Sequence, residues 1–213
     1  MPTDRDLLTL AQWFSPAYPL GSFAYSHGLE AAVAEGWVED AESLQGWLED
    51  ILRDGTGRSD AIWLRLAHQD GTDLADLAAE ARAYVPTRER LREAERQGAA
   101  FARTTRDIWG IDLPDAVLPI VVGRAVRLLG LDVDVAAAMF LQGFAGNLVS
   151  AAQRLLALGQ TEAQGVLVAL QGVCAQVASD SAGAGLDDLF SNSFLSDIAA
   201  MKHETQEPRL FQS

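Results

Sequence analysis

Residues 40–55 read DAESLQGWLEDILRDG, and the spacing of the apolar side chains in this stretch indicates the fold class. These side chains recur at positions i, i+3, i+4, i+7 and i+8, which lie on one stripe of an α-helix. The stripe consists of Leu44, Trp47, Leu48, Ile51 and Leu52. Asp40 is a suitable N-cap before this helix, and Gly55 is a suitable stop after it.

The same helical period continues through most of the chain. Thr161 and Gln164 have the spacing of a capping box, and they precede a second stripe of Val166, Leu167, Leu170, Val173, Cys174 and Val177. Further helices are expected over residues 4–14, 23–34, 59–69, 72–84, 87–108, 116–129, 133–158 and 193–204. No run of alternating apolar and polar residues is long enough for a sheet. The sequence therefore predicts an all-α, single-domain bundle of about nine or ten helices, with the Ala- and Gly-rich residues 133–158 at its centre.

The last part of the chain differs in character from the rest. We expect a helical core in residues 1–186 and a C-terminal partner-binding tail in residues 187–213, both within one domain. Small and polar residues over 179–192 are typical of a flexible connector. Six apolar residues follow it: Phe194, Leu195, Ile198, Met201, Leu210 and Phe211. A segment this short has difficulty burying them alone, so it either docks on the core or becomes ordered on a partner.

Composition and charge exclude several classes of protein. The formal net charge of −14 disfavours nucleic-acid binding, although seven of the sixteen cations fall between Arg82 and Arg106. Such uneven charge suits a protein partner or a second copy of the chain, or simply reflects solvated helix faces. A single cysteine, Cys174, excludes an internal disulfide and indicates a reducing compartment, the cytoplasm. No stretch of about 18 uninterrupted apolar residues predicts a membrane span, and the N-terminus lacks an apolar signal core.

The sequence also lacks the common motifs of catalysis and metal binding. Phosphate loops of the GxxxxGK type are absent, and the sole lysine is Lys202. His203 begins a stretch, HETQE, that resembles HExxH but has Glu207 in place of the second histidine, so a transient nickel contact competes with a protein-contact role. Ser26 and His27 lack an accompanying oxyanion-hole motif. We therefore expect a protein that is not an enzyme and holds no stable metal or cofactor.

Three separated stretches carry a resemblance to a known family. Residues 10–30, LAQWFSPAYPLGSFAYSHGLE, are similar to the pattern SPALPVGGFSYSQGLE, and residues 147–161, NLVSAAQRLLALGQT, are similar to AVRLVPLGQT. Residues 197–213, DIAAMKHETQEPRLFQS, are similar to a C-terminal HExQxxRLFxS. The chain thus resembles the UreF family of urease accessory proteins nearly from end to end. It departs from the patterns at Ser22, Ala24, His27, Ala157 and Gln212.

The resemblance implies an all-helical protein that forms a homodimer and binds UreD, also called UreH, through its tail. The complex would then recruit the nickel GTPase UreG, either regulating its GTP hydrolysis or only holding it in place, and pass nickel to apo-urease. Nickel would travel through the assembled complex without being bound stably by this chain. Neither nucleic acid nor a membrane is implied as a partner.

Eleven residues are candidates for partner binding on this basis. In the tail we expect apolar contacts from Phe194, Leu195, Leu210 and Phe211 and polar contacts from His203, Glu204 and Arg209. Arg154 and Gln160 belong to the second matched stretch, where Arg154 either couples to UreG or only offsets the dipole at the end of its helix.

Tyr25 and Glu30 complete the set if the first matched stretch faces a partner. The alternative is a rigid turn that packs Phe14, Tyr18 and Phe23 into the core. Two rival functions remain from other classes. One is a helical DNA-binding or other scaffold protein that uses residues 82–106, and the other is a small hydrolase that uses Ser26 or His27.

Overall fold

The first stripe forms helix α3 (Ala41–Asp54) in the computed structural model, which describes residues 1–213, and all five of its apolar side chains are buried. The Asp40 side chain accepts a hydrogen bond from the backbone N–H of Ser43 at 2.9 Å. Gly55 ends α3 and directly precedes α4 (Thr56–His68). The predicted N-cap and the predicted stop are therefore both confirmed.

The chain forms ten α-helices and two short 3₁₀ helices, and it contains no strand. The remaining elements are α1 (Asp4–Trp13), η1 (Ser22–Ala24), α2 (Leu29–Ala34), α5 (Leu74–Tyr84), α6 (Arg88–Trp109), α7 (Leu118–Leu128), α8 (Val133–Leu155), α9 (Gln160–Asp180), η2 (Leu186–Asp188) and α10 (Phe194–His203). The predicted all-α class is confirmed.

Two local predictions were wrong for identifiable reasons. The helix expected over residues 23–34 is split, because His27 and Gly28 adopt positive φ values of 60° and 77° that no α-helix contains. The capping box expected at Thr161 does not form, because the helix begins earlier; instead the Glu162 carboxylate accepts the backbone N–H of the N-cap residue Gly159 at 2.9 Å. Helix α9 therefore begins at Gln160.

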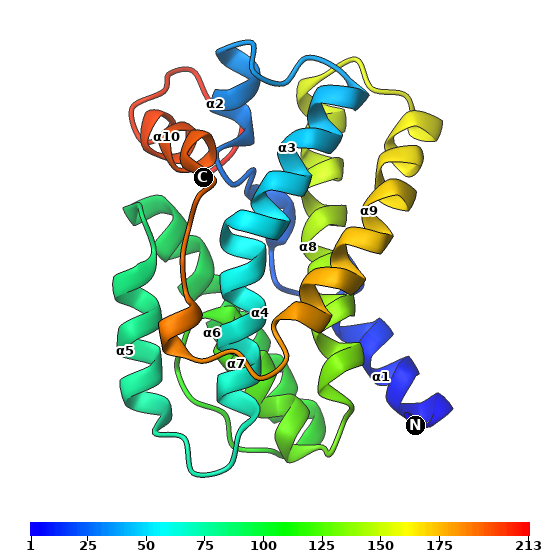
Figure 1. The fold of residues 1–213 in the computed structure, drawn as a ribbon, viewed down its shortest axis with the longest axis vertical. Coiled ribbons are helices and arrows are strands. Elements are labelled where there is room, and N and C mark those ends of the chain that lie inside the picture. The colour runs from blue at the N-terminus through cyan, green and yellow to red at the C-terminus, as the bar shows by residue number, and fades with distance from the viewer.

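Helix α8 occupies the centre of the bundle, as its many small residues predict. It packs against α1, α2, α3, α4, α7 and α9 (Figure 1). By length and composition α8 is the one helix that qualifies as a membrane span, but half of its apolar window is buried by other parts of the same chain. Core helices of water-soluble proteins share this composition.

The first loop packs only partly as a rigid core turn. Tyr18 is buried, and its hydroxyl lies 2.8 Å from the hydroxyl of Thr105. Phe14 packs edge-on against Phe140 with ring centroids 6.0 Å apart. Phe23, however, is 77% exposed because η1 lies at the surface, so its predicted core position was wrong.

The C-terminal tail folds back onto the N-terminal part of the chain. The backbone N–H of Asn192 donates to the carbonyl oxygen of Asp54 at 2.7 Å, which fixes the connector against the end of α3. Helix α10 then packs against α2, and the last residues run beside α6 (Figure 1). Residues from both ends of the sequence thus meet at one end of the bundle.

Candidate functional site

The site that unites most of the candidate residues is a buried polar cluster beneath the tail. Glu30 of α2 is only 7% exposed, yet its carboxylate has three partners. One oxygen accepts the backbone N–H of Leu210 at 2.6 Å, and the other accepts that of Phe211 at 2.9 Å. The second oxygen also lies 3.2 Å from Nε2 of His203. Glu30 therefore holds the tail in place from within.

His203, at the end of α10, links Glu30 to α6. Its side chain is fully buried, and its Nδ1 lies 2.8 Å from Oε2 of Glu89. Because both ring nitrogens face carboxylates, only the doubly protonated imidazolium donates to both partners. Burial acts to raise the pKa of Glu89, but the hydrogen bonds and charges of His203 and Arg209 outweigh it and lower that pKa.

The final residues are held by further hydrogen bonds. The backbone N–H and the hydroxyl of Ser26 both donate to the carbonyl oxygen of Ser213, at 2.9 Å and 2.5 Å. The Ser213 hydroxyl donates to the Glu93 carboxylate at 2.5 Å. The backbone N–H of Gln212 donates to the carbonyl oxygen of Ala24 at 2.9 Å. Ser26 therefore serves in tail docking, and its surroundings do not form a nucleophile with a base.

Two more candidate residues join the tail to the helices. Glu204 accepts the backbone N–H groups of Arg88 and Glu89 at 2.8 Å and 3.2 Å, so it satisfies free donors in the first turn of α6. Arg154 donates to the carbonyl oxygen of Phe23 at 2.8 Å, and its guanidinium lies 4.3 Å from the ring centre of Phe211. From the last turn of α8, Arg154 thus touches both the first loop and the tail.

The structure divides the candidate residues into a buried set and an exposed set. Tyr25, Glu30, His203 and Phe211 are all less than 9% exposed, so the exposed rim imagined near Tyr25 and Glu30 is corrected: these side chains face the protein interior. The exposed set consists of Phe194, Leu195, Arg209, Leu210, Arg154 and Gln160, and the eleventh candidate, Glu204, is half-buried between the two sets. Gln160 forms no hydrogen bond to the tail, so the structure leaves it outside the cluster.

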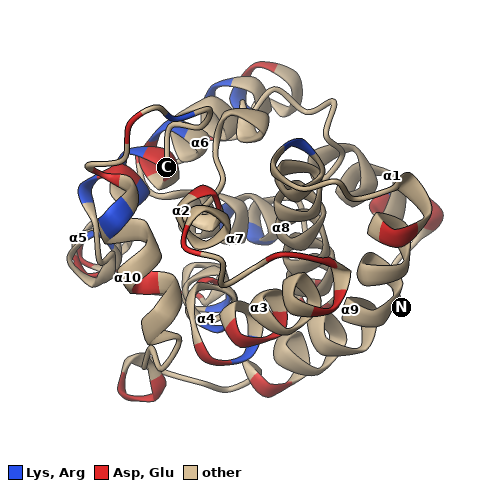
Figure 2. Cartoon of the chain, turned by 90° about the horizontal axis from the view of Figure 1, so that it is seen from above, with Lys and Arg blue, Asp and Glu red and all other residues tan.

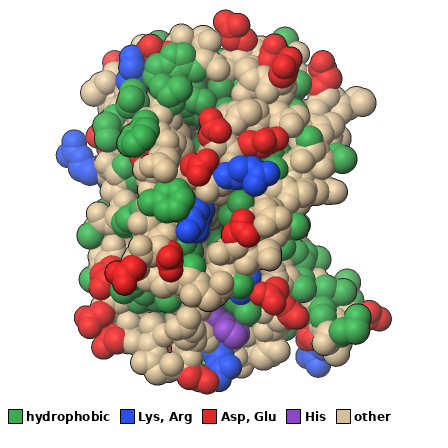
Figure 3. All heavy atoms as spheres, in the orientation of Figure 1, with side chains coloured by type: hydrophobic (Ala, Val, Ile, Leu, Met, Phe, Trp, Pro, Cys, Tyr) green, Lys and Arg blue, Asp and Glu red, His purple; other side chains and the backbone are tan.

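The exposed apolar candidates lie on and beside α10. Phe194 is 66% exposed and Leu195 is 55% exposed, while Ile198 and Met201 extend the same apolar surface with 42% and 52%. Leu210, also 55% exposed, belongs to the segment that follows. Figure 3 shows hydrophobic side chains gathered on the upper left of the molecule, where Figure 1 places α10. An apolar helix face of this size is unusual on a surface that contacts only water.

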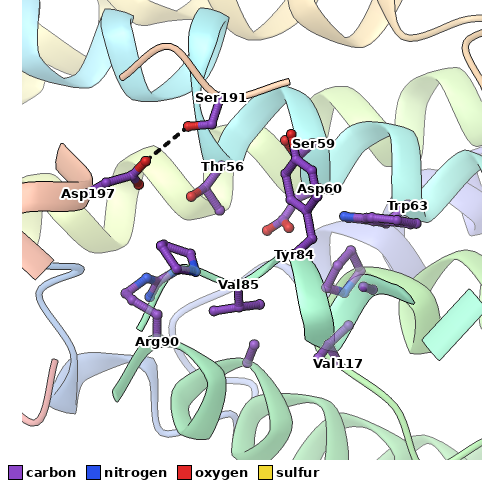
Figure 4. A pocket seen from close by; sticks show the side chains of 14 residues that line it. Thr56, Ser59, Asp60, Trp63, Tyr84, Val85, Arg90, Val117, Ser191 and Asp197 are labelled. Atoms are coloured by element: carbon purple, nitrogen blue, oxygen red, sulfur yellow. Dashed lines mark hydrogen bonds between the residues drawn. The ribbon is translucent and has the colours of Figure 1, made fainter. Parts of the chain in front are cut away.

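A separate cavity of about 130 Å³ is bounded by α4, α5, α6, α7, α10 and the connector (Figure 4). Asp60 lines it without a hydrogen-bond partner, and burial raises the pKa of this carboxyl to about 7. Asp197 of α10 lines the same cavity. Burial raises its pKa as well, although the hydroxyl of Ser191 donates to it at 3.2 Å.

His27 contacts Thr56, one of the residues that line this cavity. The His27 Nε2 is 3.2 Å from the Thr56 hydroxyl, and its Nδ1 is buried without a partner. Burial keeps the pKa of His27 well below its usual value. No group of three His, Cys, Asp or Glu side chains is arranged to hold a metal ion.

Sequence reasoning missed Glu89, Glu93 and Asp60. In the sequence, Glu89 and Glu93 are two acidic residues among the arginines of residues 82–106, and nothing marks them as part of a site. Their i, i+4 spacing places them on one face of α6, but nothing local shows that the tail covers this face. Three arginines of that segment are satisfied within the chain: Arg82 pairs with Glu95, Arg90 with Glu93, and Arg106 with Asp115.

Comparison with known proteins adds independent support. A sequence model of the UreF family matches residues 38–171. The chain is 52% identical over 209 residues to the urease accessory protein UreF of Cereibacter sphaeroides strain KD131, covering 97% of this chain and 98% of that protein. It is 44% identical over 214 residues to the protein of the same name from Ruegeria pomeroyi, covering 100% and 99% of the two chains. The chain therefore belongs to the UreF family of urease accessory proteins.

Proposed function

We propose that this chain is a non-catalytic helper of urease maturation that binds UreD, recruits the GTPase UreG and so supports nickel delivery to apo-urease. The observation that carries the proposal is the exposed apolar face of α10, which a rigidly docked tail presents to the outside. A partner of this surface gains the free energy of apolar burial without first ordering the tail, because Glu30 and Glu89 already hold it.

This arrangement assigns different tasks to the candidate residues of the tail. Phe194, Leu195 and Leu210 are exposed and serve as direct contacts with UreD. His203 and Phe211 are buried, so they act by positioning those contacts. The partner-binding surface is therefore proposed to depend on both sets, although only the first set touches the partner.

A surface substitution tests the UreD contact. The double variant F194S/L195S removes two exposed apolar side chains and is expected to lower the amount of UreD captured at least about tenfold, as for central interface residues. V168S, which alters a 64% exposed residue on α9, is the matched control and should capture UreD normally. Full capture by F194S/L195S, with an unchanged circular dichroism spectrum, would show that α10 is not the contact.

The link to UreG is proposed to run through Arg154. Its guanidinium touches Phe211 and the carbonyl oxygen of Phe23, so it connects α8 to the tail and to the first loop. R154A is expected to change the rate of GTP hydrolysis by the assembled complex while leaving Tm nearly unchanged, since exposed cation–π contacts contribute only about 0.5–1 kcal/mol. A change in Tm without a change in GTP turnover would contradict this role.

The remaining parts of the proposal concern the assembly and its setting. We propose a homodimer in the cytoplasm, where the one thiol stays reduced and nickel is cargo rather than a resident cofactor. The decisive measurement is the nickel content of urease purified from cells with and without this chain under scarce nickel. Equal nickel content in the two preparations would rule out the proposed function.

A further inference from the structure

One face of α6 carries arginines that the protein itself does not neutralise. Arg88, Arg92, Arg96 and Arg103 are exposed, and none of them forms a salt bridge. Figure 2 shows basic positions on α6 close to the C-terminus. Other arginines also lack a salt bridge, among them Arg5, Arg53, Arg58, Arg124 and Arg154, but each of these lies on a different helix, whereas the four of α6 share one helix face.

Two of these arginines line a pocket at the junction of α6 and the tail. The pocket has a volume of about 170 Å³, and its lining residues are Tyr25, Glu89, Arg92, Arg96, Arg209, Phe211 and Gln212. Arg92 and Arg96 lie one helical turn apart and therefore share a face. Arg209 lines the pocket from the tail. Three guanidinium groups thus surround one small space.

The hydrogen bonds leave this pocket with an excess of positive charge. Glu89 is its one carboxylate, and that carboxylate already binds Arg209 at 2.5 Å and His203 at 2.8 Å. Arg96 donates only to the neutral side-chain oxygen of Gln212, at 2.9 Å, and Arg92 has no hydrogen-bond partner. Two guanidinium groups are therefore free to bind an anion, for which paired arginines are well suited.

The size and lining of the pocket select the class of anion. Pockets for nucleotides and other drug-sized ligands usually exceed about 300 Å³, so this one is too small for them. The guanidinium groups attract a carboxylate and a phosphate alike, so inorganic phosphate is the competing ligand that the test has to exclude. Tyr25 and Phe211 provide apolar wall for the methylene groups of a side chain. We infer that this arginine pocket receives a glutamate or aspartate side chain from an acidic segment of a partner protein.

This inference goes beyond the proposed function, because it assigns a second contact that is separate from the apolar face of α10. Its test uses a fluorescently labelled hexaglutamate peptide as the probe and fluorescence anisotropy with the full chain at low salt. The acidic chain repels this peptide overall, so binding reports a local site rather than the general field of the protein. Inorganic phosphate serves as a competing probe.

The variants separate the pocket from the rest of the arginine row. R92Q/R96Q is expected to weaken peptide binding at least about tenfold, because charge-assisted hydrogen bonds are lost. R88Q/R103Q removes the same charge from the same helix outside the pocket and should weaken it less than about threefold. R92Q alone, which removes no hydrogen bond of the protein, should also weaken binding several-fold, with a circular dichroism spectrum like that of the unaltered chain.

Three results would overturn the inference. The first is that the intact chain fails to bind the peptide, and the second is that both double variants lose affinity equally. The third is that inorganic phosphate binds more tightly than the peptide, which would make this a site for a free anion. Since the F194S/L195S variant leaves the arginine pocket intact, failure of either proposal can be recognised separately.

Discussion

Nε2 of His203 lies 3.2 Å from the carboxylate of Glu30, although 173 residues separate the two along the chain. The same carboxylate accepts the backbone N–H groups of Leu210 and Phe211. One buried side chain near the N-terminus therefore fixes both the end of α10 and the residues after it. Exposed and buried positions in the tail follow from this connection.

Replacement of Glu30 by glutamine tests that connection. In E30Q one oxygen becomes an NH₂ group, which cannot accept the N–H donors of the tail, so buried donors lose their partner at a cost of about 1–3 kcal/mol. We expect amide hydrogen exchange at Leu210 and Phe211 to accelerate about tenfold or more. E35Q is the control, because Glu35 pairs with Lys202 at the surface, where such pairs contribute little. Equal protection in E30Q and the unaltered chain would contradict the proposed anchoring.

Glycine substitutions test the close packing of α4 against α7. A Cβ atom at Gly123 would overlap the carbonyl oxygen of Leu64, so G123A forces two central helices apart and should lower the free energy of unfolding by about 2 kcal/mol or more. Gly165, on α9, has open space at its Cβ position, and G165A should raise that free energy by about 0.5–1 kcal/mol. Urea denaturation measures both. Similar effects of the two substitutions would contradict the packing described.

The cavity beside α10 gives the protein a specific pH dependence. Burial raises the pKa of Asp60 to about 7, above the ordinary value of 3.8, so the folded state favours the protonated carboxyl. Its stabilising contribution is complete below pH 3.8 and is lost as pH rises through about 7. D60N has no carboxyl at this position and therefore does not lose stability in this way. The free energy of unfolding of D60N should exceed that of the unaltered chain by an amount that increases between pH 4 and pH 8, to at most about 4 kcal/mol.

The control for Asp60 removes an equal charge at an exposed position. Asp50 lies on the solvent side of α3, and D50N should shift stability by less than about 0.5 kcal/mol, with no growth between pH 4 and pH 8. Thermal unfolding of the two variants across this range gives the comparison. Parallel curves for D60N and the unaltered chain would show that Asp60 is not desolvated.

Cys174 should be unreactive in the folded protein. Burial on α9 raises the pKa of this thiol to about 11, and only the thiolate reacts readily with disulfide reagents. At pH 8 we expect labelling by an aromatic disulfide to be at least about tenfold slower in the native chain than in urea. Equal rates would mean that α9 opens easily.

Local sequence was sufficient for most of the helices because the signals that define them are local. The apolar stripe around Trp47, the cap at Asp40 and the stop at Gly55 lie within one segment and need no distant partner. The prediction failed at His27 and Gly28, where positive φ values break the helical period although the residues on both sides follow it. Composition identified α8 as central, since small side chains allow close approach by several helices.

The candidate site was less predictable, because it depends on contacts between distant residues. Leu210 and Phe211 are adjacent and equally apolar, yet the first is 55% exposed and the second is 3% exposed. The folded tail turns the Phe211 side chain into the hydrophobic core and leaves that of Leu210 at the surface. Likewise, Arg90 and Arg92 look equivalent in the sequence, but Glu93 pairs with the first and the second faces the arginine pocket.

The sequence by itself determined the all-α class, most helix positions and the family, because periodicity, capping and short motifs are written in neighbouring residues. Only the tertiary structure decided that the tail docks on α2 and α6, which of its side chains face solvent, and where charge stays unpaired. The physical reason is that burial and charge pairing depend on groups brought together in space, and here those groups lie up to 187 residues apart.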